Sequence, residues 1–179
     1  SVAATPPWSL WDGKDYKNMS DQDEAKFRMI EYHKWKFKAK IFSPLAPLTV
    51  KRTPVLMTRV EYGFLGSYNK YKKSPFETFY MGGDGMSGYS STYATETIGL
   101  RGYENGSIAG NGGYNSYGYA YSRLSMELRY PFLLEPSSTI YGLVFVEAGN
   151  AWRDLKDFNP FQLKRSAGVG VRIFLPMIG

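Results

Sequence analysis

The stretch EYHKWKFKAKIF, residues 31–42, alternates between two kinds of side chain. The odd positions from Trp35 to Ile41 are apolar, whereas every even position from Lys34 to Lys40 is a lysine. Successive residues of a β-strand point to opposite faces, so this pattern predicts a strand with one apolar and one basic face. A helix would mix the two sets. We call Lys34, Lys36, Lys38 and Lys40 the lysine stripe.

The same alternation recurs further along the chain, in residues 55–64, 119–130, 139–149 and 166–174. One face of the stretch 119–130 carries Arg123, Glu127 and Arg129 and is therefore polar. The stretch 139–149 is mostly apolar on both faces, and Glu147 is its one charged residue. Strands of roughly ten residues are long enough to cross a bilayer when tilted. The sequence therefore predicts an all-β fold, an antiparallel meander.

Shorter features connect these strands. A partial strand is expected in residues 1–4, and a short helix in the polar segment 12–28. Residues 43–53 form a proline-bearing turn, and residues 133–137 form a short turn between two strands.

One connection, residues 66–118, is far longer than the others and holds twelve of the 19 glycines. We call it the long loop. Loops of this length are uncommon in compact domains and are usually functional. It contains Arg101, whose nearest carboxylates along the chain are Glu96 and Glu104. If Arg101 is buried, an acidic partner must come from elsewhere in the fold.

Composition limits the remaining classes. The 179 residues suit a single domain, here taken as residues 1–179, and the net charge is +6. The absence of cysteine excludes a disulfide framework and thiolate metal sites. No run approaches 18 apolar residues, so no transmembrane helix is expected, whereas alternating strands remain compatible with a transmembrane β-barrel.

Two features that could indicate a cofactor, metal or catalytic site are not supported by the surrounding sequence. Gly83-x-Gly85-x-x-Gly88 matches a dinucleotide fingerprint, but no helix-forming sequence follows it, so we predict no cofactor. His33 is the only histidine, so we predict neither a metal site nor a catalytic triad.

Two further possibilities concern charged side chains. The lysine stripe could follow a nucleic-acid backbone, but its lysines and the neighbouring aromatic residues point to opposite faces, so we expect no nucleic-acid partner. Glu127 and Glu147 could form a glycosidase pair. However, Glu127 shares its face with Arg123 and Arg129, which favours an ion network over an enzyme site.

Four motifs in series resemble the BamA-type outer-membrane assembly factors of the bacterial surface antigen superfamily. The aromatic residue Tyr80 precedes Met81 and the glycine pair Gly82-Gly83, and the tetrad Leu100-Arg101-Gly102-Tyr103 follows, as in the sixth extracellular loop of that family. The stretches 124–131, 144–152 and 166–171 resemble the strands that come after this loop. The resemblance covers residues 35–179 in order.

This resemblance implies a 16-stranded transmembrane β-barrel, of which the chain would supply about strands 9–14, with the long loop folded into the lumen. It also implies that Arg101 pairs with Glu127 and Glu147. Alternation alone offers Glu127 as one candidate, and the choice of Glu147 depends on the resemblance. We call the tetrad and these two glutamates the latch. The further barrel strands and the periplasmic repeat domains of the family are expected outside this sequence.

The function implied is non-enzymatic folding and insertion of outer-membrane proteins by strand templating, in the bacterial outer membrane. Expected partners are outer-membrane lipid, unfolded outer-membrane proteins as clients, and assembly-complex lipoproteins in the full-length protein. A two-partner secretion translocator of the same superfamily is the alternative. A nucleic-acid-binding sheet and a glycan-acting enzyme are the alternatives from other classes.

Overall fold

The computed structural model describes residues 1–20, 23–47, 49, 52–83, 96–108, 117–135 and 138–175. Within these ranges, six strands form one sheet in the order β1-β2-β3-β6-β7-β8, and every neighbouring pair is antiparallel. The strands are β1 (Val2–Ala4), β2 (His33–Pro44), β3 (Val55–Gly66), β6 (Ala120–Glu135), β7 (Ser138–Trp152) and β8 (Lys164–Phe174). The predicted antiparallel meander is confirmed. β1 and β8 form the two edges of the sheet in the described part of the chain, so barrel closure is not seen.

Some predicted boundaries are wrong. β2 begins at His33 rather than at residue 31, because the backbone N–H of Tyr32 donates to the Thr5 hydroxyl rather than to a strand carbonyl. The Glu31 carboxylate accepts hydrogen bonds from the backbone N–H and the hydroxyl of Ser9. The predicted turn 133–137 is mostly strand: β6 continues to Glu135, and residues 136–137 lie outside the described residues. A register shift between Pro131 and Leu133 lets the ladder to β7 continue beyond the proline.

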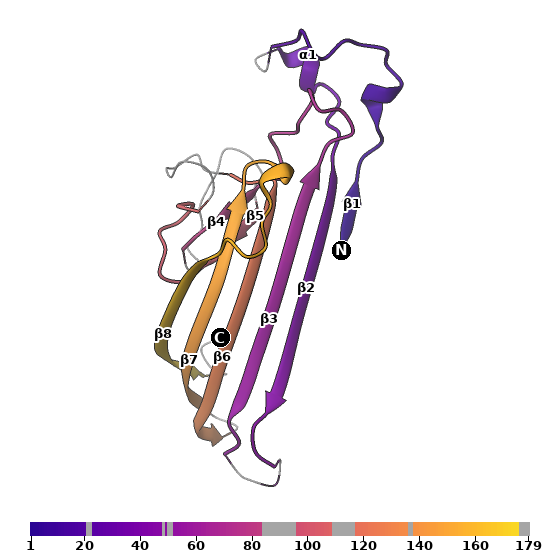
Figure 1. Cartoon of the computed structure of the whole chain (residues 1–179). Coiled ribbons are helices and arrows are strands. Elements are labelled where there is room, and N and C mark those ends of the chain that lie inside the picture. Colours follow the sequence, from indigo (N-terminus) through magenta and orange to yellow (C-terminus); the bar gives the residue numbers. More distant parts are fainter. Residues whose placement is uncertain are drawn as a thin grey trace.

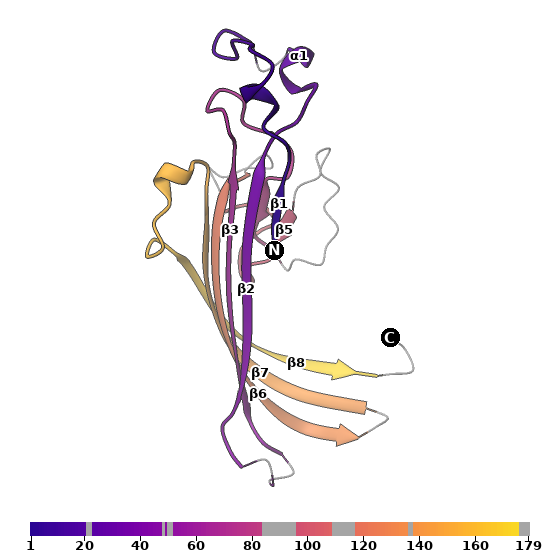
Figure 2. The same cartoon turned by 90° about the vertical axis from the view of Figure 1, so that its right-hand side faces the viewer.

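The two faces of the sheet differ as alternation predicts. One face is apolar and exposed along its length, and its side chains include Trp35, Phe37, Met126, Val146 and Val169. The other face is polar, because cross-strand partners share a face and the pairs Lys38–Glu61 and Glu61–Arg123 lie on it. The sheet bends, and the lower parts of β6, β7 and β8 curve toward the side where β5 lies (Figure 2). The polar face is therefore the concave one.

The described part of the long loop contains secondary structure of its own. Between Gly66 and Ala120 it holds a parallel pair, β4 (Phe79–Met81) and β5 (Glu96–Ile98), which alternation did not predict. Bridges from Met81 to Ile108 and from Gly83 to Leu100 extend this pair. Its apolar side chains pack against the concave face in a core of Leu65, Phe79, Met81, Ile98, Leu100, Ile108, Tyr121 and Ala151. The loop is thus fixed to the sheet by apolar burial before any ion pair is considered.

The upper end of the sheet carries a cap (Figure 1). It contains the 3-10 helix Trp8–Leu10 and the short helix α1 (Glu24–Phe27), which confirms the helix expected in residues 12–28. Asp23 caps α1 by accepting a hydrogen bond from the backbone N–H of Ala25. A second 3-10 helix, Leu155–Asp157, lies between β7 and β8. Among the described residues, no helix has the length and apolar character needed to cross a membrane.

Candidate functional site

The tetrad Leu100-Arg101-Gly102-Tyr103 follows the end of β5 after one intervening residue, on the concave face of the sheet. Leu100 is fully buried in the apolar core, which fixes the backbone position of its neighbour Arg101. Gly102 has φ +87°, a conformation that side-chain-bearing residues rarely adopt, and a Cβ there would lie 3.2 Å from the Ser166 Cβ. The tetrad therefore places Arg101 against the strands that follow in the sequence.

Arg101 and Glu147 are joined by three hydrogen bonds. The Glu147 carboxylate accepts hydrogen bonds from the Arg101 backbone N–H (3.0 Å), its Nε (3.1 Å) and its Nη2 (2.8 Å). Arg123 Nη2 and the Ser125 hydroxyl also donate to Glu147, at 3.0 and 3.1 Å. The Glu147 side chain has no exposed surface. A buried carboxylate needs such a set of donors, because burial without them is strongly unfavourable.

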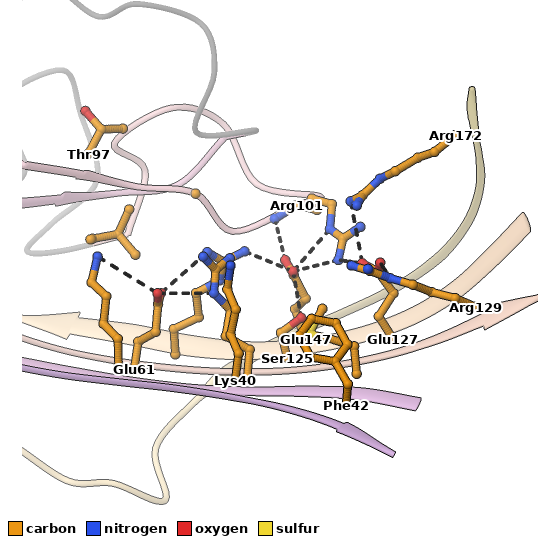
Figure 3. A pocket seen from close by; sticks show the side chains of 16 residues that line it. Lys40, Phe42, Glu61, Thr97, Arg101, Ser125, Glu127, Arg129, Glu147 and Arg172 are labelled. Atoms are coloured by element: carbon orange, nitrogen blue, oxygen red, sulfur yellow. Dashed lines mark hydrogen bonds and ion pairs between the residues drawn. The ribbon is translucent and has the colours of Figure 1, made fainter. Parts of the chain in front are cut away.

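Glu127 is the second carboxylate beside Arg101, and it comes from β6. Arg101 Nη2 donates to Glu127 at 3.0 Å, and Arg129 Nε donates at 2.6 Å. Arg172 of β8 lies 3.6 Å from the same carboxylate. Figure 3 shows the three arginines around Glu127, with Glu147 next to it. The arginine of the long loop is thus held by carboxylates from two adjacent strands.

An aromatic ring packs against the Arg101 guanidinium. The Arg101 guanidinium carbon lies 3.6 Å from the ring centroid of Phe145, which is two residues before Glu147 on the same face. Phe145 in turn covers Gly168 of β8, where a Cβ would lie 2.7 Å from the ring. Stacking orients the planar guanidinium for hydrogen bonds at its edge, which an ammonium group could not reproduce.

The glycine pair before the tetrad meets a different requirement. Gly82 and Gly83 have φ +126° and +78°. A Cβ on Gly82 would overlap the backbone carbonyl oxygen of Glu104, and a Cβ on Gly83 would overlap the Asn105 side chain. Both glycines therefore let two parts of the long loop approach closely. Gly85 and Gly88, which completed the dinucleotide pattern, lie outside the described residues.

We expect Gly82→Ala to loosen the long loop by on the order of 1–3 kcal/mol, because it adds both a strained φ and a backbone overlap. The measurement is the rate of proteinase K cleavage in residues 82–118. Gly13→Ala is the matched control, because Gly13 also has a positive φ, +64°, but nothing lies within 4 Å of its Cβ position. Equal cleavage rates in the two variants would contradict the close approach at Gly82.

The lysine stripe lies on the concave face with the latch, and most of it is paired. Lys34 contacts Glu77 at 3.0 Å, and Lys36 contacts Glu96 at 2.9 Å. Lys38 lies 3.4 Å from Glu96. Lysines that are engaged by carboxylates inside a concave face are not available to follow a nucleic-acid backbone. Sequence reasoning missed these partners, although a run of four lysines on one strand face itself indicates that acidic side chains lie opposite.

A cavity of about 430 Å³ lies at the concave face, and Arg101, Glu127 and Glu147 are among the residues that line it (Figure 3). Seven cationic side chains and three carboxylates line it. The three carboxylates are Glu61, Glu127 and Glu147, and each one contacts at least one arginine. A glycosidase needs a carboxyl group that is free to donate a proton, which these ion-paired carboxylates do not offer. Among the described residues, no cluster of three or more potential metal ligands occurs.

Comparison with known proteins gives one family. The Omp85 superfamily domain matches residues 25–179, which is most of the chain. The chain belongs to the Omp85 superfamily. No curated protein and no solved structure matches it.

Membership of the Omp85 superfamily indicates the cellular location and the general class of function. Omp85 proteins reside in the bacterial outer membrane, and they are non-enzymatic proteins of membrane transport and assembly. They act in the insertion of outer-membrane proteins or in two-partner secretion, with membrane and client proteins as their general partners. The exposed apolar face and the polar concave face agree with an Omp85 barrel wall between lipid and lumen.

Proposed function

We propose that this chain is part of a BamA-type assembly factor that folds and inserts outer-membrane proteins by strand templating. The chain would supply about strands 9–14 of a 16-stranded barrel, as the sequence resemblance implies. In this proposal Arg101, held by Glu127 and Glu147, is a latch that keeps the long loop inside the barrel. The apolar outer face would contact lipid, unfolded outer-membrane proteins would be the clients, and assembly-complex lipoproteins would bind the full-length protein.

The packing of the long loop against the concave face supports the choice of insertion over two-partner secretion. Phe79, Met81, Leu100 and Ile108 of the loop are fully buried against the sheet. Arg101 adds contacts to carboxylates on two strands. A polypeptide that crosses the membrane through the lumen would have to displace this packed segment. A barrel that templates client strands at its wall would not, so the packed loop favours insertion over secretion.

Depletion of the protein from its native cells tests the proposal. We expect a broad loss of folded outer-membrane proteins, seen as the loss of their heat-modifiable bands in gel electrophoresis. Two-partner secretion predicts a different pattern, in which one exported polypeptide disappears from the medium and the folded outer-membrane proteins remain. That second pattern would overturn the proposal and favour the translocator.

Reconstitution provides the matching test outside the cell. Proteoliposomes that contain the full-length protein and its natural accessory proteins should accelerate folding of a urea-denatured outer-membrane protein, relative to empty liposomes of the same lipid. Folding at the rate of empty liposomes would contradict insertion by templating.

A further inference from the structure

Besides the contacts of Arg101 and the apolar core, the long loop makes polar contacts with strands on both sides of β6 and β7. Glu96 of β5 faces the lysine stripe of β2, on one side of Arg101. Tyr103, on the other side, reaches β8, where its hydroxyl donates a hydrogen bond to the backbone carbonyl of Arg165 at 2.8 Å. β2 and β8 are not neighbours, because β3, β6 and β7 lie between them in the sheet. The described part of the loop therefore crosses most of the width of the sheet.

The contact with β2 involves three lysines and one carboxylate. Glu96 lies 2.9 Å from the Lys36 ammonium, 3.3 Å from that of Lys34 and 3.4 Å from that of Lys38. The Lys34 side chain is only 5% exposed and its ammonium lies 4.9 Å from the Phe79 ring centroid, so it is fixed by β4 as well. A network of charges around a largely buried lysine stabilises far more than an isolated surface pair.

The charge state of Glu96 agrees with its contacts to the lysine stripe. Partial burial alone would raise the pKa of the Glu96 carboxyl. The hydrogen bond from Lys36 and the charges of Lys34 and Lys36 outweigh burial, so the pKa of Glu96 lies below its ordinary value. Glu96 is therefore an anion at neutral pH and attracts the stripe.

We propose that Glu96 and Tyr103 are positioning residues that make the long loop a crossbar between β2 and β8, with Arg101 as its middle anchor. The inference rests on the proposed function, because it gives the latch a mechanical task. Anchored at both ends, the loop holds non-adjacent strands at a set separation and so preserves the curvature of the sheet. Arg101 alone would hold only the two adjacent strands β6 and β7.

Distance measurements in the full-length protein test the crossbar. This sequence has no cysteine, so Phe37→Cys on β2 and Val169→Cys on β8 give two labelling sites, both on the exposed apolar face. Spin labels at these sites report the separation of the two strands by pulsed electron paramagnetic resonance. Glu96→Gln should broaden and lengthen the distance distribution and raise proteinase K cleavage of the loop by about tenfold, as expected for loss of charge-assisted hydrogen bonds. Tyr103→Phe, which removes one hydroxyl, should act in the same direction and more weakly.

Matched variants separate positioning from general loss of structure. Glu104→Gln removes the other glutamate next to the tetrad, which is exposed and forms no ion pair among the described residues, and it should leave both readouts unchanged. Glu96→Lys should be worse than Glu96→Gln, and adding Lys36→Glu should restore part of the loss. If the narrow distance distribution and the slow cleavage persist in Glu96→Gln, the crossbar is wrong.

A third measurement, the rate of client folding, distinguishes failure of the crossbar from failure of the insertion proposal. If Glu96→Gln frees the loop and widens the strand separation, and neither the unsubstituted protein nor the variant folds clients faster than empty liposomes, the crossbar stands and the insertion proposal fails. If client folding falls while the loop and the distance stay unchanged, the crossbar fails and the insertion proposal stands.

Discussion

Replacing Arg101 with alanine is expected to release the long loop from the concave face while leaving the strands of the sheet in place. The substitution removes the hydrogen bonds from the guanidinium to Glu147 and Glu127, and also the stacking on Phe145. It leaves Glu147 buried with Arg123 as its one remaining cationic contact among the described residues. Removing one partner of a buried ion pair typically destabilises by about 3–5 kcal/mol.

We expect the lower end of that range, about 3 kcal/mol, because a quarter of the Arg101 side chain is exposed. This corresponds to about a 100-fold larger population of the undocked loop. The measurement is proteinase K cleavage in residues 82–118 of the full-length protein in outer membranes. Heat-modifiable mobility of the barrel should not change, because strand pairing does not involve Arg101.

Arg101→Lys is the informative companion to this variant. Lysine keeps the charge but has neither the planar fork that reaches Glu127 and Glu147 together nor the flat surface that stacks on Phe145. We expect it to restore less than half of the lost protection. Full protection in Arg101→Lys would indicate that charge alone holds the loop, and unchanged cleavage in Arg101→Ala would overturn the latch.

The second large effect is expected at Glu147, and it should exceed the effect at Glu127. Glu147 accepts hydrogen bonds from Arg101, Arg123 and Ser125, including one from the backbone N–H of Arg101. Glu147→Gln keeps the volume but places an amide group among guanidinium donors, and it leaves the interior with excess positive charge. We expect a loss of about 3 kcal/mol or more for Glu147→Gln, in line with buried ion pairs.

Glu127→Gln should destabilise less, because Arg172 is half exposed and keeps access to solvent when its carboxylate partner is lost. The readouts are loop cleavage and the temperature at which the barrel loses its heat-modifiable band. Glu135→Gln is the control, since Glu135 is an exposed carboxylate at the end of β6. The combination of Arg101→Ala with Glu147→Gln should be clearly less than additive. Equal effects of Glu127→Gln and Glu147→Gln would contradict this ranking.

The sheet was predictable because its two faces have different surroundings. On β2, Trp35 and Phe37 are exposed on the apolar face while Lys34 is buried on the concave one, and this contrast appears directly as alternation. The ends of the strands were less predictable. β6 continues past Pro131 because a register shift accommodates the proline, which a pattern of apolar and polar residues does not reveal.

The partners of Arg101 were predictable only in part. Glu127 stood out because its strand has a polar face, whereas Glu147 sits among apolar neighbours and was chosen from the family resemblance. Glu96 is close to Arg101 in sequence, but in the structure its carboxylate pairs with the lysine stripe of β2. The short parallel pair β4–β5 creates that arrangement, and three-residue strands are too short for a periodic signal.

The most direct test of the latch uses a cysteine at Ser107 in this cysteine-free sequence. Ser107 belongs to the long loop and its hydroxyl is buried while the loop is docked, so a thiol there should react with maleimide much faster when the loop undocks. In outer membranes, the account predicts slow labelling with Arg101 intact and labelling about 100-fold faster in the Arg101→Ala background. Equally fast labelling in both backgrounds would show that Arg101 does not hold the loop.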